Sequence, residues 1–442
     1  MIRFLAAGAL VLLFGGAASG DDEGLGLRQA ITLALEKNSL LQAAHYEQSA
    51  AESGVAISHS RYLPKITFEE RASVTNSPTK AFMMKLDEGR FSLAGDLNHP
   101  PTTGDFQTSL SLEQPLFDVG IVREKTVAEQ EYVSRSHAFE QRRQEVAFQV
   151  YGAYLAVQRA RAYVSVVEKA VADAREHQRL AAVRNAAGVG LKFDELRIGT
   201  FLAEIEQQKI TAVNDLALAR LRLGQVIGLP AGTAPDITDT VTAQELSLGG
   251  RELVETALSG RRDLQELEAQ LAKSEAGVSL ARGSYWPTVY AEASYQMNDR
   301  DVPLGRDNDS WVLGANLRWE LFDGLRRNNE VSRAQAGRNA VGAYLAERRR
   351  DVALQVNEAM LRREEAVKRL EVAQRAEKDA EEMVRLVNKR YENALATTVE
   401  TLDAQTALNR ARAQLVDNEA GYALANARVY HSAGLFLKEV VR

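Results

Sequence analysis

Hydrophobic positions in the C-terminal part of this chain recur at alternating steps of four and three residues. The stripe runs from Val352 to Tyr391, and only Arg363 and Glu377 interrupt it. This spacing is typical of helices that pack along their whole length, as in a coiled coil. At 1.5 Å per residue, a helix of about 60 residues would be about 90 Å long, so the pattern predicts an unusually long helix that needs partners along it.

Four short segments follow a different period, in which apolar and polar residues alternate. The clearest is Trp311–Leu321, which has the length of about 9–11 residues of a membrane-barrel strand. We expect strands at about 65–75, 106–115, 288–298 and 310–321. The chain's three tryptophans, Trp286, Trp311 and Trp319, lie at these segments, as the aromatic girdles of a membrane barrel would require. A half-buried sheet in a soluble domain would show the same alternation.

The order of these segments repeats within the chain. Residues 34–76 align with 257–299 without a gap, and residues 184–229 align with 390–435. The nine prolines leave residues 116–229 and 304–442 free of proline, which predicts long helices there. We therefore expect a first structural repeat at 21–229, a linker at 230–250 and a second repeat at 251–442. Each repeat would hold a helix, two strands and a long helical hairpin.

The first twenty residues have the pattern of a secretory signal peptide. Arg3 precedes an apolar run from Phe4 to Phe14, and small residues follow up to Gly20. A membrane anchor is the alternative, but the run is shorter than the roughly 20 residues that span a bilayer. We expect the mature chain to begin near Asp21.

Composition removes several classes of site. The chain has no cysteine, which excludes disulfides, zinc-thiolate sites and a lipid-modified cysteine. The 54 basic and 60 acidic residues are mixed along the length and give a net charge of -6, so we expect no nucleic-acid partner. The six histidines form no pair at metal-ligand spacing, and no phosphate-binding or nucleophile motif occurs. We expect no enzymatic activity, no cofactor and no metal.

Four strands are too few to close a barrel. An open sheet edge cannot stand in lipid, because each unpaired backbone group there costs several kcal/mol. Closure would have to come from other copies of the chain, and a trimer would supply twelve strands. The pattern therefore favours an oligomeric membrane protein.

Several short motifs carry a family resemblance, and they occur in two ordered copies. They are Leu35–Leu41 in the opening helix, Tyr62-Leu63-Pro64 and Tyr285-Trp286-Pro287 before two of the strands, Gln114–Asp118 and Trp319–Gly324 after the other two, and Arg390-Tyr391 with Leu402–Gln405 near the last helix turn. With these motifs the chain resembles the TolC-like outer-membrane efflux channels (outer membrane factors), over essentially all of its mature length.

The resemblance implies a mostly α-helical, internally duplicated protein with a small membrane β-barrel. Four strands per chain would close a 12-stranded barrel in a homotrimer, and long antiparallel helices would form an α-helical barrel that extends from the bacterial outer membrane into the periplasm. It also implies partners: a periplasmic adaptor (membrane fusion) protein, an inner-membrane pump of the RND, ABC or MFS type, and outer-membrane lipid. The segment between the first two strands would be an extracellular loop that caps the barrel.

The resemblance also assigns candidate site residues. Glu400 and Asp403 match inward-facing carboxylates at the channel entrance, and because residues i and i+3 share a helix face, a trimer would set them in two rings. Asp194 and Tyr391 resemble residues that latch the helix pairs shut. The tips of the helical hairpins would contact the adaptor, and in this chain they comprise Gly188, Val189, Gly190, Ala394 and Leu395. Solvated acidic residues and simple packing or turn roles are the alternatives.

The sequence thus favours a passive exit duct of a tripartite efflux or type I secretion system. The alternative is a periplasmic or surface coiled-coil scaffold protein with a small soluble sheet. Drug efflux, metal efflux and protein secretion use similar ducts, and the sequence does not separate them.

Overall fold

The computed structural model describes residues 24–440 apart from 93, 95, 244, 245, 247 and 394. The expected signal peptide at 1–20 therefore lies outside the described residues. The described chain is mostly α-helical, with four strands in one antiparallel sheet of order β1-β2-β3-β4. The strands are β1 (Lys65–Thr75), β2 (Thr103–Phe117), β3 (Thr288–Asp299) and β4 (Asn308–Arg318). The helices are α1 (Leu27–Lys37), α2 (Ser39–Ser60), α3 (Pro78–Asp87), α4 (Val119–Ala186), α5 (Lys192–Ile227), α6 (Gly250–Gly260), α7 (Arg262–Gly283), α8 (Arg326–Glu392), α9 (Thr398–Ser432) and α10 (Phe436–Glu439).

The chain folds into two compact units, each of which takes segments from both halves of the sequence. One unit, here called the tip unit, contains the residues up to Ala34 together with Gln149–Thr242 and Arg369–Ala423. The other, here called the sheet unit, contains Leu35–Phe148, Ala243–Lys368 and the residues from Leu424 on.

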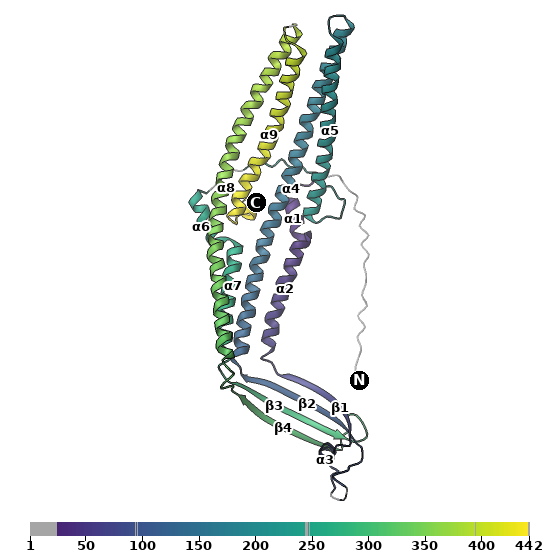
Figure 1. Cartoon of the computed structure of the whole chain (residues 1–442), viewed down its shortest axis with the longest axis vertical. Coiled ribbons are helices and arrows are strands. Elements are labelled where there is room, and N and C mark those ends of the chain that lie inside the picture. Colours follow the sequence, from purple (N-terminus) through teal and green to yellow (C-terminus); the bar gives the residue numbers. More distant parts are fainter. Residues whose placement is uncertain are drawn as a thin grey trace. The chain divides into compact units, whose positions relative to one another are not determined.

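In the sheet unit, the four strands lie side by side (Figure 1). The β1–β2 register begins at Lys65↔Glu113 and ends at Thr75↔Thr103, so β2 starts three residues before the expected position because β1 still pairs there. β4 ends at Arg318, opposite Thr288. Pro287 precedes Thr288 and has no N–H for a ladder bond, which explains why the strand stops before the expected Leu321.

The apolar stripe of the C-terminal tract lies on α8, a helix of 67 residues. Val352, Val356 and Ala359 are buried in the core of the sheet unit, where they pack with residues of α6, α7 and α9. Both residues that interrupt the stripe lie against α9. Arg363 Nε donates to Asn426 Oδ1 at 2.8 Å in the sheet unit, and Glu377 lies 3.9 Å from Arg412 Nε in the tip unit. The interruptions are therefore polar contacts within the helix seam.

A buried charge cluster joins α6, α7, α8 and α9 in the sheet unit. The Arg261 guanidinium donates to both oxygens of Asp263, to Gln355 Oε1 and to the Ser432 carbonyl. Arg348 donates two further bonds to Asp263 Oδ2. The side chains of Arg261 and Asp263 are only 7% and 10% exposed, so loss of either would leave a buried charge with fewer partners.

The tip unit consists mainly of the parts of two helical hairpins, α4–α5 and α8–α9, that lie within 149–242 and 369–423. Small and branched apolar residues form the α4–α5 seam, including Ala170, Ala174, Leu202 and Ile205. Alanines on the buried faces let the helices approach closely. None of the helices in the described part of the chain combines the length and apolar composition that crossing a membrane requires.

Candidate functional site

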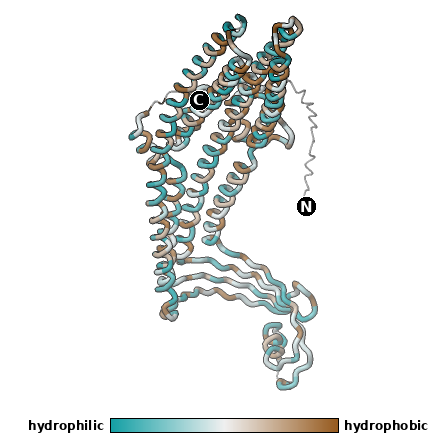
Figure 2. The backbone as a smooth tube through the Cα atoms, turned by 45° about the horizontal axis from the view of Figure 1, so that its top comes forward, coloured by the Kyte–Doolittle hydropathy of each residue, from teal (hydrophilic) through white to brown (hydrophobic). Residues whose placement is uncertain are grey.

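The two faces of the sheet differ in chemistry, although the more apolar face also carries Glu70, Thr108 and Asp309. Register and alternation place one set of residues on a polar face: Lys65, Thr67, Glu69, Arg71 and Ser73 of β1; Asp105, Gln107, Ser109, Ser111 and Glu113 of β2; Tyr290, Glu292, Ser294, Gln296 and Asn298 of β3; and Asn308, Ser310, Val312, Gly314 and Asn316 of β4. The opposite face carries Ile66 and Phe68, Leu110 and Leu112, Ala291 and Ala293, and Trp311, Leu313 and Leu317. Figure 2 shows hydrophilic and hydrophobic residues alternating along the strands.

The apolar face is exposed within the chain. Trp311 and Leu313 are each 74% exposed, and Ile66 and Phe68 on the other edge strand are exposed as well. Both β1 and β4 are edge strands of the described sheet, so each has one row of backbone groups without a sheet partner. An exposed apolar face and two open edges are features of a sheet that other molecules cover.

In the tip unit, the first hairpin turns at the glycines that the sequence singles out. Gly188 has a φ of +76°, a left-handed conformation that strongly favours glycine. A Cβ on Gly190 would lie 3.0 Å from the Asn185 amide nitrogen. The amides of Val189 and Gly190 both donate to the Arg184 carbonyl, and Val189 is 77% exposed at the end of the turn.

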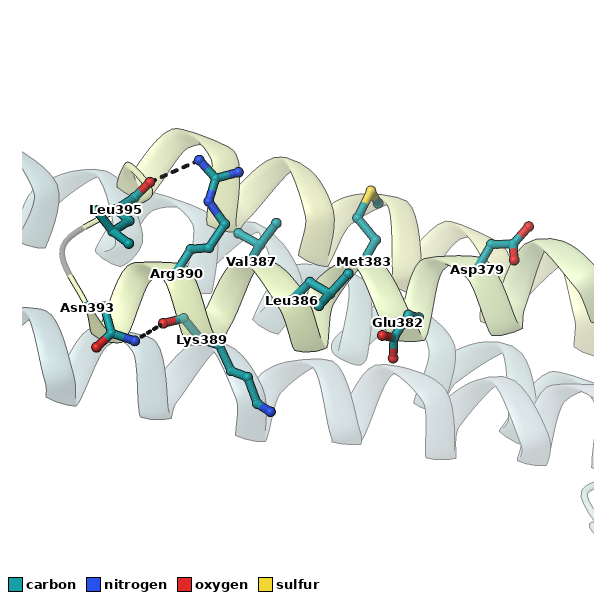
Figure 3. Close-up of a pocket in the computed structure, with 9 residues that line it drawn as sticks. All are labelled: Asp379, Glu382, Met383, Leu386, Val387, Lys389, Arg390, Asn393 and Leu395. Carbon is teal, nitrogen blue, oxygen red and sulfur yellow. Dashed lines mark hydrogen bonds between the residues drawn. The ribbon is translucent and has the colours of Figure 1, made fainter.

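The second hairpin turns between α8 and α9, and Ala394 at its centre lies outside the described residues. Leu395 is exposed, and its amide donates to the Arg390 carbonyl while Arg390 Nη2 donates back to the Leu395 carbonyl at 3.0 Å. Figure 3 shows this bond and a second one within the turn, from Asn393 Nδ2 to the Lys389 carbonyl. The Arg390 side chain therefore stabilises the turn between α8 and α9, to which it belongs.

The two candidate entrance carboxylates have different surroundings. Glu400 Oε2 accepts from the Thr397 amide at 2.6 Å and from the Thr397 hydroxyl at 2.9 Å, while the Glu400 amide donates back to that hydroxyl. This is a capping box at the start of α9. These hydrogen bonds hold the pKa of Glu400 below its ordinary value. Asp403 is exposed, and its side chain has no hydrogen-bond or ion-pair partner among the described residues.

The two latch candidates also differ in their contacts: the Asp194 side chain has no partner among the described residues, whereas Tyr391 contacts Arg184. Asp194 lies in the first turn of α5. Its neighbour Glu195 accepts from Asn185 Nδ2 and from Lys192 Nζ, both at 2.7 Å. These bonds, that from Lys192 first, lower the pKa of Glu195.

Tyr391 contacts a residue that the sequence did not single out. The Arg184 guanidinium carbon lies 4.6 Å from the centroid of the Tyr391 ring, and Arg184 Nη2 donates to the Tyr391 carbonyl at 3.2 Å. The contact joins α4 of the first hairpin to the end of α8 in the second. The internal alignment gave a signal, because Arg184 is the counterpart of Arg390 in the repeat, but it could not show that the two arginines have different contacts.

Further along the same two hairpins, a polar seam joins α4 to α9. Gln405 is 2% exposed, and its amide donates to Asp173 Oδ2 at 3.3 Å and to Asn409 Oδ1 at 3.2 Å. Beside it a groove of about 500 Å³ is lined by α4, α8 and α9. Burial lowers the pKa of His177, which lines this groove. The two hairpins thus meet through separable polar contacts in addition to apolar packing.

A second groove, of about 640 Å³, lies along the end of α8 (Figure 3). Met383, Leu386 and Val387 give it an apolar floor, and charged residues such as Glu382 and Lys389 lie around them. Met383 and Leu386 are 39% and 48% exposed within the chain. Among the described residues, no group of three or more His, Asp or Glu side chains is placed to hold a metal ion.

Comparison with known proteins gives consistent matches. The sequence model of the outer membrane efflux protein family matches residues 30–229 and 253–435. Protein CyaE of Bordetella pertussis is 29% identical over 192 residues, which are 42% of this chain and only 39% of CyaE. Outer membrane protein OprJ of Pseudomonas aeruginosa is 24% identical over 401 residues, which cover 86% of this chain and 78% of OprJ.

The fold also matches a solved structure. The crystal structure of the Campylobacter jejuni CmeC outer membrane channel superposes with a TM-score of 0.80 at 15% sequence identity. The superposition covers 94% of this chain and 87% of that chain. At this identity the likeness concerns the fold.

Proposed function

The chain belongs to the outer membrane efflux protein family, and from this premise we propose that three copies form a passive exit duct of a tripartite efflux or secretion system. The protein is an outer-membrane channel of this family, which disfavours the coiled-coil scaffold. The proposal adds the trimer, the closed barrel, the partners and the roles of individual residues.

The two-faced sheet is the observation that supports the proposal most directly. In a closed barrel, the face with Trp311 and Leu313 would contact lipid, and the face with Ser111 and Gln296 would line water. Closure requires partners for the open edges of β1 and β4, because unpaired backbone groups are too costly in lipid. Pairing β1 of one copy with β4 of the next would satisfy both edges. Three copies would give twelve strands, a number that can close into a small barrel.

The domain divisions are part of this proposal. Residues 1–20 would be a cleaved signal peptide, and the repeats at 21–229 and 251–442 would each supply two strands and one hairpin. The linker at 230–250 would form part of a belt around the helices. In the tip unit, Arg161 supports this role by pairing with Asp236 and donating to the Ile237 carbonyl at 2.9 Å.

We propose that the hairpin tips meet a periplasmic adaptor, which links the duct to an inner-membrane pump. Val189 and Leu395 expose apolar side chains at the two tips, 77% and 68% respectively. Exposed apolar residues at both turns favour a protein partner there. One relative, OpmQ of Pseudomonas aeruginosa, is described as a pyoverdine export outer membrane protein, and export of small molecules is the role that we extend to this chain.

We propose that Asp403 accounts for most of the cation selectivity at the channel entrance. Its carboxylate is exposed and unpaired, whereas the carboxylate of Glu400 is engaged by Thr397. In a trimer three Asp403 side chains would form a ring that attracts cations and resists close approach. Tyr391 would act in the closed latch through Arg184, with Asp194 as a further candidate at the first tip.

Single-channel recording of the purified protein in a planar bilayer tests the proposal. The expected result is discrete, cation-selective openings from a detergent-stable trimer. A water-soluble rod that does not insert, although circular dichroism shows it to be folded, would refute the duct. Openings whose cation selectivity is unchanged in Asp403→Asn would keep the duct and remove the entrance ring.

A further inference from the structure

A cavity of about 780 Å³ lies in the sheet unit where the strands meet the helices. The end of α2, the starts of α4 and β1, and the adjoining ends of β2 and β3 surround it. Its volume is within the range of about 300–1,000 Å³ that is usual for small-molecule sites. None of the entrance, latch or tip residues lines this cavity.

The strand residues that line the cavity belong to the polar face of the sheet. Lys65 pairs with Glu113, and Pro115 pairs with Tyr290. The residues that alternate with them, such as Ile66 and Leu112, belong to the opposite face. In the proposed barrel the cavity therefore opens to the aqueous lumen, and this step rests on the proposed function.

Part of the charge around the cavity is already engaged. Asp118 accepts from the Tyr290 hydroxyl at 2.5 Å and from the Gly120 and Ile121 amides, so it caps α4. Arg61 forms an ion pair with Glu124. The Tyr290–Asp118 hydrogen bond joins β3 to the start of α4 in the wall of the cavity, and Glu124 compensates the charge of Arg61.

Glu113 and Lys65 are the charged side chains that remain available. Neither side chain has a hydrogen-bond or ion-pair partner among the described residues. Glu113 lies directly across from Lys65 in the β1–β2 register and from Glu292 in the β2–β3 register, so one opposite and one like charge flank it. Among the residues that line the cavity, the three carboxylates of Glu113, Asp118 and Glu124 outnumber the two cations of Arg61 and Lys65, so the net charge of the lining favours a cation.

The rest of the lining is apolar. Leu63, Pro64 and Pro115 contribute to the wall beside the strands, and Ile121 and Leu280 contribute from α4 and α7. Tyr290 adds an aromatic ring close to Glu113 and Arg61. A ring beside a carboxylate suits an organic cation, which is attracted to both.

We propose that this cavity binds amphipathic organic cations transiently as they pass through the duct. The charged group would contact Glu113 and the Tyr290 ring, and the apolar body would cover Leu63 and Ile121. A trimer holds three such cavities around the lumen. Weak binding is compatible with transport, because a solute must leave the site as readily as it arrives.

Blocking of single-channel current by tetraphenylphosphonium tests this inference, with tetraphenylborate as a probe of the same shape and opposite charge, in sodium chloride. The expected result is brief blocks by the cation and none by the anion. Glu113→Gln should shorten the blocks about five- to tenfold, as expected for the loss of one partly solvated charge contact. Leu63→Lys should abolish them, and Leu63 is 57% exposed, so the fold should tolerate the change.

Two controls locate the site. Glu52→Gln changes an exposed carboxylate of α2 outside the cavity and should leave the blocks unchanged. Asp403→Asn should alter ion selectivity without changing the length of the blocks. Normal openings with no cation block, or with blocks equally long in Glu113→Gln, would overturn the cavity as a binding site and leave the duct intact. A folded protein without openings would refute the duct and, with it, this inference.

Discussion

The Arg184 guanidinium lies over the ring of Tyr391, 4.6 Å from its centroid, and joins the first helical hairpin to the second. A cation–π contact of this kind contributes about 0.5–2 kcal/mol. If it belongs to the closed latch, Arg184→Ala should raise the open probability of the channel about two- to thirtyfold. Single-channel recordings give the open probability directly. Arg179→Ala, which removes an ion pair within α4, is the matched control and should have little effect. Equal effects of the two changes would exclude Arg184 from the latch.

The two entrance carboxylates should be separable by substitution. Asp403→Asn should lower cation over anion selectivity strongly, because this carboxylate is exposed and unpaired. Glu400→Gln should have a smaller effect on selectivity, because its carboxylate is held against Thr397 at the start of α9. Reversal potentials in a salt gradient measure both. A larger effect from Glu400→Gln would contradict the assignment.

Partly buried His431 should make the sheet unit sensitive to acid. It stacks on Phe148, with 4.3 Å between ring centroids, and burial, reinforced by Arg261 and Arg428, lowers its pKa to about 4. Between pH 6.5 and 4 the unfolded chain therefore binds a proton that the folded chain does not, so stability falls as the pH falls. The loss should be of the order of 3 kcal/mol at the lower end. Thermal unfolding measured between pH 6.5 and 4 should show this loss of stability. In His431→Phe the stability should depend less on pH over the same range. An unchanged profile would mean that the histidine is not the sensor.

The buried charge cluster predicts a large loss of stability from one substitution. Asp263→Ala leaves the buried Arg261 guanidinium without its bidentate carboxylate, which should cost about 3–5 kcal/mol. Denaturant unfolding in detergent measures the loss. Glu268→Ala removes an exposed pair with Arg349 from the same helix and should cost no more than about 1 kcal/mol. Similar losses in both variants would argue against an important buried pair.

The faces of the sheet predict which substitutions the membrane tolerates. Leu313→Arg places a charge on the apolar face of β4 and should cost about 2–4 kcal/mol near the middle of the bilayer. Asn316→Arg places the same charge on the polar face and should be tolerated. The yield of folded trimer in outer-membrane fractions compares the two. Equal yields would refute the assignment of the faces to lipid and lumen.

Sequence periodicity predicts most of the fold because its signals are local. The stripe on α8 and the alternation along β4 follow from residues a few positions apart, and a buried helix seam and a two-faced strand require such patterns. The capping box of Thr397 and Glu400 is also a local signal, T-x-x-E before a helix. From the sequence, Glu400 is interpreted as an entrance carboxylate or as a solvated acidic residue, and neither interpretation includes its capping role.

The contacts that distinguish the candidate sites are not local. Arg184 and Tyr391 are 207 positions apart in the chain, and nothing in the residue types indicates that they meet. The cavity beside Glu113 depends on the β2–β3 register, which shifts between Pro115 and Phe117, and on the packing of α4 and α7 against it. Such features depend on tertiary packing, which periodicity does not encode.

Arg184 and Arg390 are counterparts in the two halves of the chain, yet one reaches to the neighbouring hairpin and the other closes its own turn. A ring of six equivalent hairpins would open symmetrically, with every hairpin moving by the same amount. The Arg184 contact joins the two hairpins of one chain, so in the proposed trimer it would bridge three of the six interfaces between hairpins. In the proposed trimer the interfaces without this contact would therefore be the weaker ones, and one substitution at Arg184 would remove all three contacts at once.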